Sequence, residues 1–324
     1  MEKIQAAIAK ARAERERKVA EETSGGAPAQ AAAPVPEAAA TSAPAPEPAA
    51  ASRAPASPAR ARGPVRPGRP DAGAATPSPE APQFTVPAIS PDITAAWQEL
   101  PSFAPKPRAM TRQRIVSFGG TDGSAEIDML RTRVLRQMRA NGWRRLAITS
   151  PGRDCGKSTL ALNLAFSLAR QSDLRTIVCD MDLKRPALAG ILGLKGSRSF
   201  ARVLQGETSF RAEAVRVRPN LAFGLTETRV RNSAELLQGP MIGPALAALS
   251  RNYAPDVMIF DMPAMLSRDD TMAFLGHVDC ALLVAGAGTT TLREVDSCEA
   301  DLAQQTNVLG GVLNKCRYMD RRHA

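Results

Sequence analysis

The chain is poor in aromatic residues. Its 324 residues include two tryptophans, two tyrosines and nine phenylalanines. Proteins that bind single-stranded nucleic acid stack bases on aromatic side chains set among basic ones, and no segment of this sequence shows that interleaving. Nucleic acid is therefore not the expected partner, although the net charge is +10.

Long apolar runs are also missing. Residues 1–22 contain no continuous apolar stretch of the kind that forms a cleavable signal, and no segment approaches the length of a membrane-spanning helix. We therefore expect a soluble cytoplasmic protein that reaches the inner membrane through a partner or through its surface charge.

The cysteines follow no metal-ligand or redox spacing, which fits a reducing cytosol. There are five: Cys155, Cys179, Cys280, Cys298 and Cys316. Cys179 and Cys280 lie in apolar strand patterns and are expected in the core. Cys155 is either a small residue that fits its loop or an oxidation-sensitive thiol.

The N-terminal third has too few large apolar residues to form a core. Residues 23–82 consist mainly of Ala, Pro and Ser, so we expect a disordered linker over residues 23–110. Between residues 83 and 114, however, Phe84, Trp97 and Phe103 could pack on the folded domain, which we place at residues 111–324.

Residues 1–22 contain strong helix formers and a narrow apolar stripe that includes Ile4 and Ile8. Such a stripe is too narrow to fold alone. The segment is either a docking helix on a long tether or a solvated helix, and we favour docking.

A phosphate-binding loop follows a short apolar strand at residues 146–149. The sequence SPGRDCGKST places Gly156, Lys157 and Ser158 at the start of a helix, where backbone N–H groups and the lysine face an anion. The strict motif needs a glycine where this chain has Pro151. The candidate nucleotide-binding residues are Gly152, Arg153, Asp154, Cys155, Gly156, Lys157, Ser158 and Thr159.

Two further apolar runs end in carboxylates. Residues 176–180 lead to Asp180 and Asp182, and residues 257–261 end at Asp261. Because ligands bind at the carboxyl ends of parallel strands, these aspartates and Ser158 are candidate ligands of one Mg²⁺–nucleotide site. The alternative is that the loop is an ordinary turn and the aspartates are helix caps.

Strands and helices alternate after residue 145. The remaining strands are predicted at residues 280–285 and 308–313. Helices are predicted at residues 157–170, 234–250 with breaks at Gly239-Pro240 and Gly243-Pro244, 271–276 and 292–305. This alternation predicts an α/β fold of the P-loop NTPase type, with a mostly parallel sheet and helices on both faces.

One segment is strongly basic. Six arginines and no acid lie between Arg131 and Arg145, while Ile127, Leu130, Val134 and Met138 recur at helical spacing. The arginines form either a solvated helix face or a face for an anionic partner, such as a lipid surface, an acidic protein or DNA.

These motifs resemble the kinase domain of bacterial tyrosine kinases of capsule and exopolysaccharide synthesis, within the MinD/ParA-like P-loop ATPases. The resemblance covers residues 125–317. It rests on the loop, on the run from Asp180 through Asp182 to Arg185-Pro186, and on the run ending at Asp261. Weaker matches are residues 232–237 and 130–132, and residues 311–314, whose Asn314 resembles an adenine-reading asparagine.

The resemblance implies ATP and Mg²⁺ as cofactors. Lys157 would neutralise phosphate charge, Ser158 would bind Mg²⁺, and Asp180, Asp182 and Asp261 would hold the metal and its waters. One of the first two aspartates would help to deprotonate the acceptor hydroxyl. The implied partners are a membrane chain-length or export protein and further copies of the same chain.

Four departures from the family pattern stand out. Asp154 places a negative charge beside the expected phosphates. Asp128 stands where the family's oligomerisation helix has an arginine, and the glutamate of that helix is displaced to Glu126. The run after Asp261 lacks a second proline. The C-terminal tyrosine cluster is reduced to Tyr318, which would be the phosphoacceptor.

The leading hypothesis is therefore a tyrosine-kinase-like ATPase acting in exopolysaccharide or capsule synthesis. The first alternative is a nucleotide-dependent switch that transfers no phosphate, which Asp154 and the missing tyrosines favour. The second is a positioning ATPase of the ParA/MinD type. That class carries a second lysine near the start of its loop, where this chain has Gly152.

Overall fold

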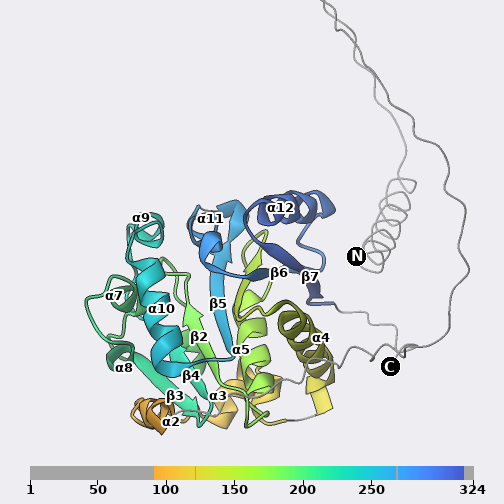
Figure 1. Cartoon of the computed structure of the whole chain (residues 1–324). Coiled ribbons are helices and arrows are strands. Elements are labelled where there is room, and N and C mark those ends of the chain that lie inside the picture. Colours follow the sequence, from red (N-terminus) through yellow and green to blue (C-terminus); the bar gives the residue numbers. More distant parts are fainter. Residues whose placement is uncertain (1–90, 121, 268, 317–324) are drawn as a thin grey trace, which may run out of the picture. The chain divides into compact units, whose positions relative to one another are not determined.

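The computed structural model describes residues 91–120, 122–267 and 269–316, and these form one seven-stranded sheet with helices on both faces (Figure 1). The strand order is β3-β4-β2-β5-β1-β6-β7, and only the β3–β4 pair is antiparallel. The strands are β1 Arg145–Ser150, β2 Thr176–Asp180, β3 Ala214–Arg218, β4 Leu221–Gly224, β5 Val257–Ala264, β6 Cys280–Gly286 and β7 Asn307–Asn314. The predicted α/β fold class is confirmed.

The helices within these ranges are α2 Pro91–Gln98, α3 Pro107–Arg112, α4 Ala125–Asn141, α5 Lys157–Leu168, α6 Leu188–Leu192, α7 Phe200–Leu204, α8 Phe210–Glu213, α9 Ser233–Leu237, α10 Ile242–Tyr253, α11 Asp270–Phe274 and α12 Leu292–Gln305. Short 3₁₀ turns are η1 Val116–Phe118, η2 Asp122–Ser124, η3 Met265–Ser267 and η4 Leu275–His277. None of the helices in the described ranges is both long and apolar enough to cross a bilayer.

Alternating side chains of the central strands fill two cores, one on each face of the sheet. In β5, Met258 and Phe260 belong to the core that includes α7 and α10, whereas Val257 and Ile259 belong to the core of α4 and α5. Strands buried on both faces must be apolar at nearly every position. This requirement explains why β1, β2, β5 and β6 were recognisable as continuous apolar runs.

The helix predicted over residues 234–250 is two helices. It breaks at Gly239-Pro240, as predicted, but the second predicted break at Gly243-Pro244 is wrong. Pro244 lies in the first turn of α10, where proline is tolerated because the N–H groups there have no helical partner.

Strands β3 and β4 were not predicted. Each is four or five residues long and they form an antiparallel hairpin at one edge of the sheet. Their sequences, AVRVR and LAFG, are too short to distinguish from loop or helix by periodicity.

The boundary placed at residue 111 is wrong, because residues 91–110 belong to the folded domain. Trp97 is 2 % exposed, and its indole N–H donates to the Tyr253 carbonyl oxygen over 2.7 Å. The predicted docking helix at residues 1–22 and most of the predicted linker lie outside the described residues.

The same N-terminal arm continues along the outer edge of β3. The Phe103 N–H donates to the Arg216 carbonyl oxygen (2.9 Å), and the Arg216 N–H donates to the Pro101 carbonyl oxygen (2.7 Å). Backbone groups of the edge strand are thereby paired with a segment more than a hundred residues away in sequence.

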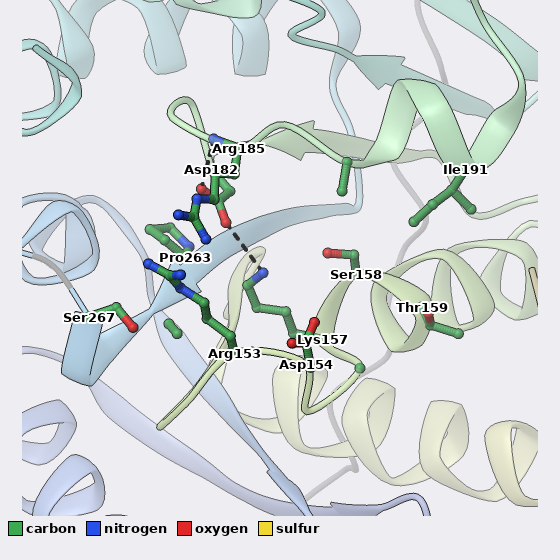
Figure 2. A pocket seen from close by; sticks show the side chains of 13 residues that line it. Arg153, Asp154, Lys157, Ser158, Thr159, Asp182, Arg185, Ile191, Pro263 and Ser267 are labelled. Atoms are coloured by element: carbon green, nitrogen blue, oxygen red, sulfur yellow. Dashed lines mark hydrogen bonds and ion pairs between the residues drawn. The ribbon is translucent and has the colours of Figure 1, made fainter. Parts of the chain in front are cut away.

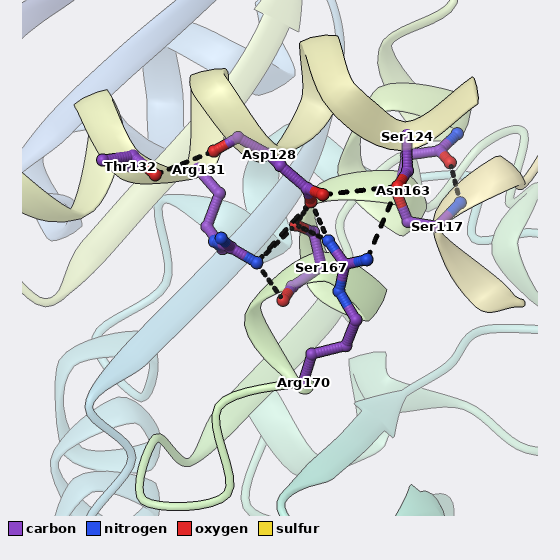
Figure 3. Close-up of polar contacts among 8 residues, drawn as sticks. All are labelled: Ser117, Ser124, Asp128, Arg131, Thr132, Asn163, Ser167 and Arg170. Carbon is purple, nitrogen blue, oxygen red and sulfur yellow. Dashed lines mark hydrogen bonds and ion pairs between the residues drawn. The ribbon is translucent and has the colours of Figure 1, made fainter. Parts of the chain in front are cut away.

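A polar network joins α4 to α5 (Figure 3). Asp128 forms ion pairs with Arg131 and Arg170 and accepts a hydrogen bond from Ser167. Arg131 also donates to the Ser167 carbonyl oxygen at 3.2 Å. Asp128, the aspartate that departs from the family pattern, therefore links α4 to α5 within this chain.

The arm is expected to contribute substantially to stability. Replacing Trp97 with alanine removes a fully buried indole and its hydrogen bond, and should lower the free energy of unfolding by about 3–5 kcal/mol. Gln98→Ala, on the exposed side of the same helix, should change it by about 0.5 kcal/mol or less. Denaturant titration of both variants checks this. Equal stabilities would mean that the arm is not part of the cooperative fold.

Candidate functional site

The phosphate-binding loop links β1 to α5. It runs from Pro151 to Gly156, and Lys157 is the first residue of α5. The N-terminus of this helix carries a partial positive charge and N–H groups without helical partners, so it is suited to an anion. The loop and helix therefore occur where the sequence predicted them.

Gly156 is the position in the loop that cannot carry a side chain. Its φ is +91°, and a Cβ there would lie 2.2 Å from the Nδ2 atom of Asn314. That Asn314 amide donates to the Cys155 carbonyl oxygen at 2.9 Å. In this structure Asn314 thus holds the loop against the end of β7.

Cys155 fills a buried position behind the loop. It is 2 % exposed, and its Sγ lies 3.3 Å from the Gly152 carbonyl oxygen and 3.4 Å from the Thr290 hydroxyl. These contacts support the interpretation of Cys155 as a small residue that fits the space behind its loop.

Two aspartates lie beneath the loop on neighbouring strands. Asp180 and Asp261 are register partners in the β2–β5 pair and are completely buried. One oxygen of Asp180 accepts hydrogen bonds from the N–H groups of Ala187 and Leu188, at 3.1 and 3.0 Å. The helix-cap role, which was the alternative for the aspartates, therefore accounts for one of the two Asp180 oxygens and leaves the other without this role.

Three carboxyl oxygens at this position have no hydrogen bond of ordinary geometry within the described residues: one from Asp180 and both from Asp261. Burial and the neighbouring Asp261 raise the pKa of Asp180 well above its usual value. Burial also raises the pKa of Asp261, while the Lys157 ammonium and the Ser158 hydroxyl lower it. Buried carboxylates of this kind need a cation.

Lys157 supplies part of that charge. Its Nζ atom lies 3.5 Å from Asp182 Oδ2, and both side chains are mostly buried. Burial alone would lower the pKa of Lys157, but Asp261, Asp182 and Asp180 together raise it. The lysine is therefore protonated and points at the three candidate carboxylates.

The residues around these groups form a pocket of about 290 Å³ (Figure 2). Of the predicted nucleotide-binding residues, six line it: Arg153, Asp154, Gly156, Lys157, Ser158 and Thr159. Asp182 lines it as well, whereas Gly152, Cys155 and Asn314 do not. Tyr318, the predicted phosphoacceptor, lies outside the described residues.

The structure adds lining residues that were not predicted as part of the site, among them Arg185, Ile191 and Ser267. Arg185 was visible only as part of the family motif, and its N–H donates to Asp182 Oδ1 at 3.2 Å. Ser267 belongs to the turn η3, whose Leu266 N–H donates to the Pro151 carbonyl oxygen. No sequence signal marked that turn.

The donor set fits a hard cation bound together with a phosphorylated ligand. Mg²⁺ prefers oxygen ligands and usually takes only one or two carboxylates from the protein, with phosphate oxygens and waters completing its coordination. The orphaned oxygens of Asp180 and Asp261 match that chemistry, and the Ser158 hydroxyl lies beside Asp261. Within the ranges that the structure describes, no group of three or more His, Cys, Asp or Glu could hold a metal ion.

Comparison with known proteins agrees with this geometry. The model of the CobQ/CobB/MinD/ParA nucleotide binding domain matches residues 146–323, which is more than half of the chain. The chain is 34 % identical over 177 residues to the succinoglycan biosynthesis transport protein ExoP of Rhizobium meliloti (strain 1021), covering 52 % of this chain and 22 % of that protein.

A second relative is the putative tyrosine-protein kinase CapB of Staphylococcus aureus, 25 % identical over 197 residues, which are 57 % of this chain and 81 % of CapB. The tyrosine-protein kinase etk of Escherichia coli (strain K12) is 29 % identical over 175 residues, 52 % of this chain and 23 % of that kinase. The chain thus matches about a fifth of the length of ExoP and etk.

Solved structures show the same fold. The kinase domain of the Escherichia coli tyrosine kinase ETK has a TM-score of 0.56 at 23 % identity, covering 63 % of this chain and 82 % of that one. The VpsO kinase domain has a TM-score of 0.53 at 25 % identity, covering 64 % and 96 %. The chain belongs to the CobQ/CobB/MinD/ParA family of nucleotide-binding domains, and its similarity to bacterial tyrosine kinases confirms the resemblance found in its sequence.

Proposed function

We propose that this chain binds ATP with Mg²⁺ and transfers the terminal phosphoryl group to a tyrosine hydroxyl. The observation that carries the proposal is the buried pair Asp180 and Asp261, whose unbonded oxygens lie beneath the protonated Lys157. A site with this charge pattern is suited to phosphoryl transfer, which depends mainly on positioning and charge neutralisation.

In this mechanism Lys157 and the N-terminus of α5 hold the phosphates. Ser158, Asp180 and Asp261 would hold Mg²⁺, which neutralises charge on the phosphate oxygens when bound. Asp182 lines the pocket, whereas Asp180 is buried and capped by two N–H groups. Asp182 is therefore the aspartate suited to accept the proton as the tyrosine oxygen forms its bond to phosphorus and ADP leaves.

The proposed setting is exopolysaccharide or capsule synthesis at the inner membrane. The names of the relatives ExoP and CapB support it, one being a biosynthesis transport protein and the other a tyrosine kinase. The protein would act in the cytoplasm as a homo-oligomer with a membrane chain-length or export protein. The exposed arginines of α4, among them Arg133, Arg136 and Arg139, would face the anionic membrane surface.

A nucleotide-dependent switch without phosphoryl transfer is the second candidate. Two observations favour it. Asp154 lines the pocket with its negative charge. Tyr253, the tyrosine among the described residues, is 8 % exposed and packs against Trp97 and Phe210. Incubation of the protein with labelled ATP, with and without the cytoplasmic part of a co-encoded membrane protein, distinguishes the candidates, because only a kinase labels protein.

Nucleotide binding should depend on Lys157. Lys157→Ala removes a charged contact to the phosphates and should weaken Mg²⁺–ATP binding by about 2 kcal/mol or more, roughly thirtyfold. Lys195→Ala, an exposed lysine outside the pocket, is the matched control. Isothermal titration calorimetry measures both affinities. Unchanged affinity in Lys157→Ala would contradict the site assignment.

Asp154 should have two separable effects, one on the stability of the fold and one on ATP binding. Its φ is +57°, a left-handed conformation that costs free energy for a residue with a side chain, and its charge repels phosphate. Asp154→Gly and Asp154→Asn should each strengthen ATP binding by about 1 kcal/mol, near fivefold. Only the glycine variant should also raise the melting temperature, because glycine adopts positive φ freely. Calorimetry and thermal unfolding check these outcomes, and unchanged ATP affinity in both variants would show that the charge is offset.

If the protein phosphorylates itself, Tyr318 is the expected acceptor. It lies among basic residues close to the C-terminus, whereas Tyr253 is buried. Mass spectrometry after incubation with Mg²⁺–ATP and the membrane partner should find phosphate on Tyr318. Phosphate on Tyr253 alone would contradict this assignment, and phosphate on neither residue would favour the switch.

A further inference from the structure

Four arginines at the carboxyl ends of the parallel strands carry unpaired charge. Arg153 and Arg185 line the nucleotide pocket, and Arg229 and Arg231 lie on the loop between β4 and α9. All four residues are exposed, and none of their guanidinium groups forms an ion pair or a hydrogen bond with another of the described residues. We call these four arginines the basic rim.

A backbone hydrogen bond joins the loops that carry the basic rim. The Val230 N–H donates to the Leu183 carbonyl oxygen at 2.9 Å, and Leu183 is two residues before Arg185. Val230 packs on the core, whereas its neighbours Arg229 and Arg231 are exposed. Because consecutive Cα atoms are only about 3.8 Å apart, one extended ligand can contact arginines of both loops.

Two neighbouring basic residues are, by contrast, already paired. Lys184 lies 3.7 Å from the buried Asp270, and Arg198 lies 3.8 Å from Glu227. These ion pairs hold the loops together and leave the charge of the basic rim uncompensated. Like charges on one surface repel each other and attract an anionic ligand, so the rim is suited to a negatively charged partner.

The basic rim begins beside the group suited to take the proton of the acceptor. The Arg185 N–H donates to Asp182 Oδ1 at 3.2 Å, and Asp182 Oδ2 lies 3.5 Å from Lys157 Nζ. Figure 2 shows the guanidinium groups of Arg153 and Arg185 on the opposite side of Lys157 from Ser158. A tyrosine that reaches Asp182 therefore brings the residues next to it in sequence against the rim.

We propose that the basic rim binds an acidic peptide segment of another protein, and that the acceptor tyrosine lies within this segment. Acidic residues next to the tyrosine would pair with Arg153 and Arg185, and more distant ones with Arg229 and Arg231. Guanidinium groups suit this role because they bind carboxylates through two parallel hydrogen bonds. The inference rests on the proposed function, since it names the acceptor class of the same site.

The sequence around Tyr318 is a poor match to the basic rim. Residues 315–322 contain four basic residues and one acidic residue, Asp320. Because like charges disfavour binding, transfer to Tyr318 of a second copy should be slower than transfer to an acidic acceptor at the same concentration. The rim therefore favours a separate acceptor protein over another copy of this chain.

Peptide binding tests the proposal without a transfer step. The full-length protein is saturated with Mg²⁺ and a non-hydrolysable ATP analogue, and fluorescence anisotropy follows labelled peptides that carry phenylalanine in place of tyrosine. The peptide with glutamates on both sides of the phenylalanine should bind about tenfold more tightly than its glutamine counterpart. Equal affinities would overturn the proposal.

Charge reversal in the basic rim identifies the contacts. Arg229→Glu and Arg231→Glu should each weaken binding of the glutamate peptide about fivefold, and the double variant should prefer a lysine-flanked peptide. Arg251→Glu, an exposed position in the last turn of α10, is the matched control for net charge and should change the affinity less than about twofold. Thermal unfolding verifies that the variants are folded. An equal loss in the control would refute the rim as the binding site.

Labelled ATP separates this inference from the proposed function. With tyrosine restored, the glutamate peptide should be labelled with a kcat/KM about tenfold above that of a peptide copying residues 314–322. Binding without labelling would refute phosphoryl transfer and the acceptor role, while the site for an acidic segment would stand. Labelling without preference for the glutamate peptide would support transfer and overturn the inference. Loss of binding to phosphatidylserine vesicles in the rim variants, with unchanged peptide affinity, would assign the rim to a membrane and overturn it too.

Discussion

The site depends on two carboxylates that the sheet brings together in its interior. Asp180 and Asp261 are fully buried register partners on neighbouring parallel strands, and their unbonded oxygens are balanced by Lys157. Two buried negative charges at adjacent positions oppose folding unless a cation compensates them. The strand order, the loop and the first turn of α5 all serve to place that positive charge above the pair.

The helix that carries Lys157 is fixed at several points along its length. Within α5, Asn163 accepts from the Ser117 N–H and donates to the Arg114 carbonyl oxygen, while Ser167 takes part in the network with Asp128 and Arg131. These bonds connect α5, the helix that follows the nucleotide loop, to the arm before α4 and to α4 itself. Rigid placement of this helix matters, because a small displacement of a phosphate-binding lysine weakens its effect.

The sequence was sufficient to predict the central strands and the elements that carry the loop and the aspartates. Buried parallel strands are apolar at almost every position, and the apolar runs of β2 and β5 lead directly to Asp180 and Asp261, so both signals were strong. The β3–β4 hairpin and the turn η3 could not be predicted, since short edge strands and turns are defined by contacts distant in sequence. The same applies to Arg185 and Ser267, which reach the pocket because of the path of their loops.

The N-terminal arm shows a different limit of sequence analysis. Trp97 stands in a sequence rich in proline and alanine, and its burial against Tyr253 results from a contact between residues 156 positions apart. Composition favours disorder in such a segment, yet one buried indole and its hydrogen bond hold α2 on the domain. A boundary drawn from composition alone therefore falls too late in the chain.

The pairing of residues 101–103 with β3 has a consequence for shortened versions of the protein. An uncovered edge strand offers unpaired N–H and C=O groups to any other extended chain, and natural sheets protect such edges to prevent aggregation. Here the protection comes from the arm through its bonds to Arg216. A fragment that starts at residue 111 would retain the whole nucleotide site but expose this edge, and would therefore be prone to assemble through it into insoluble material.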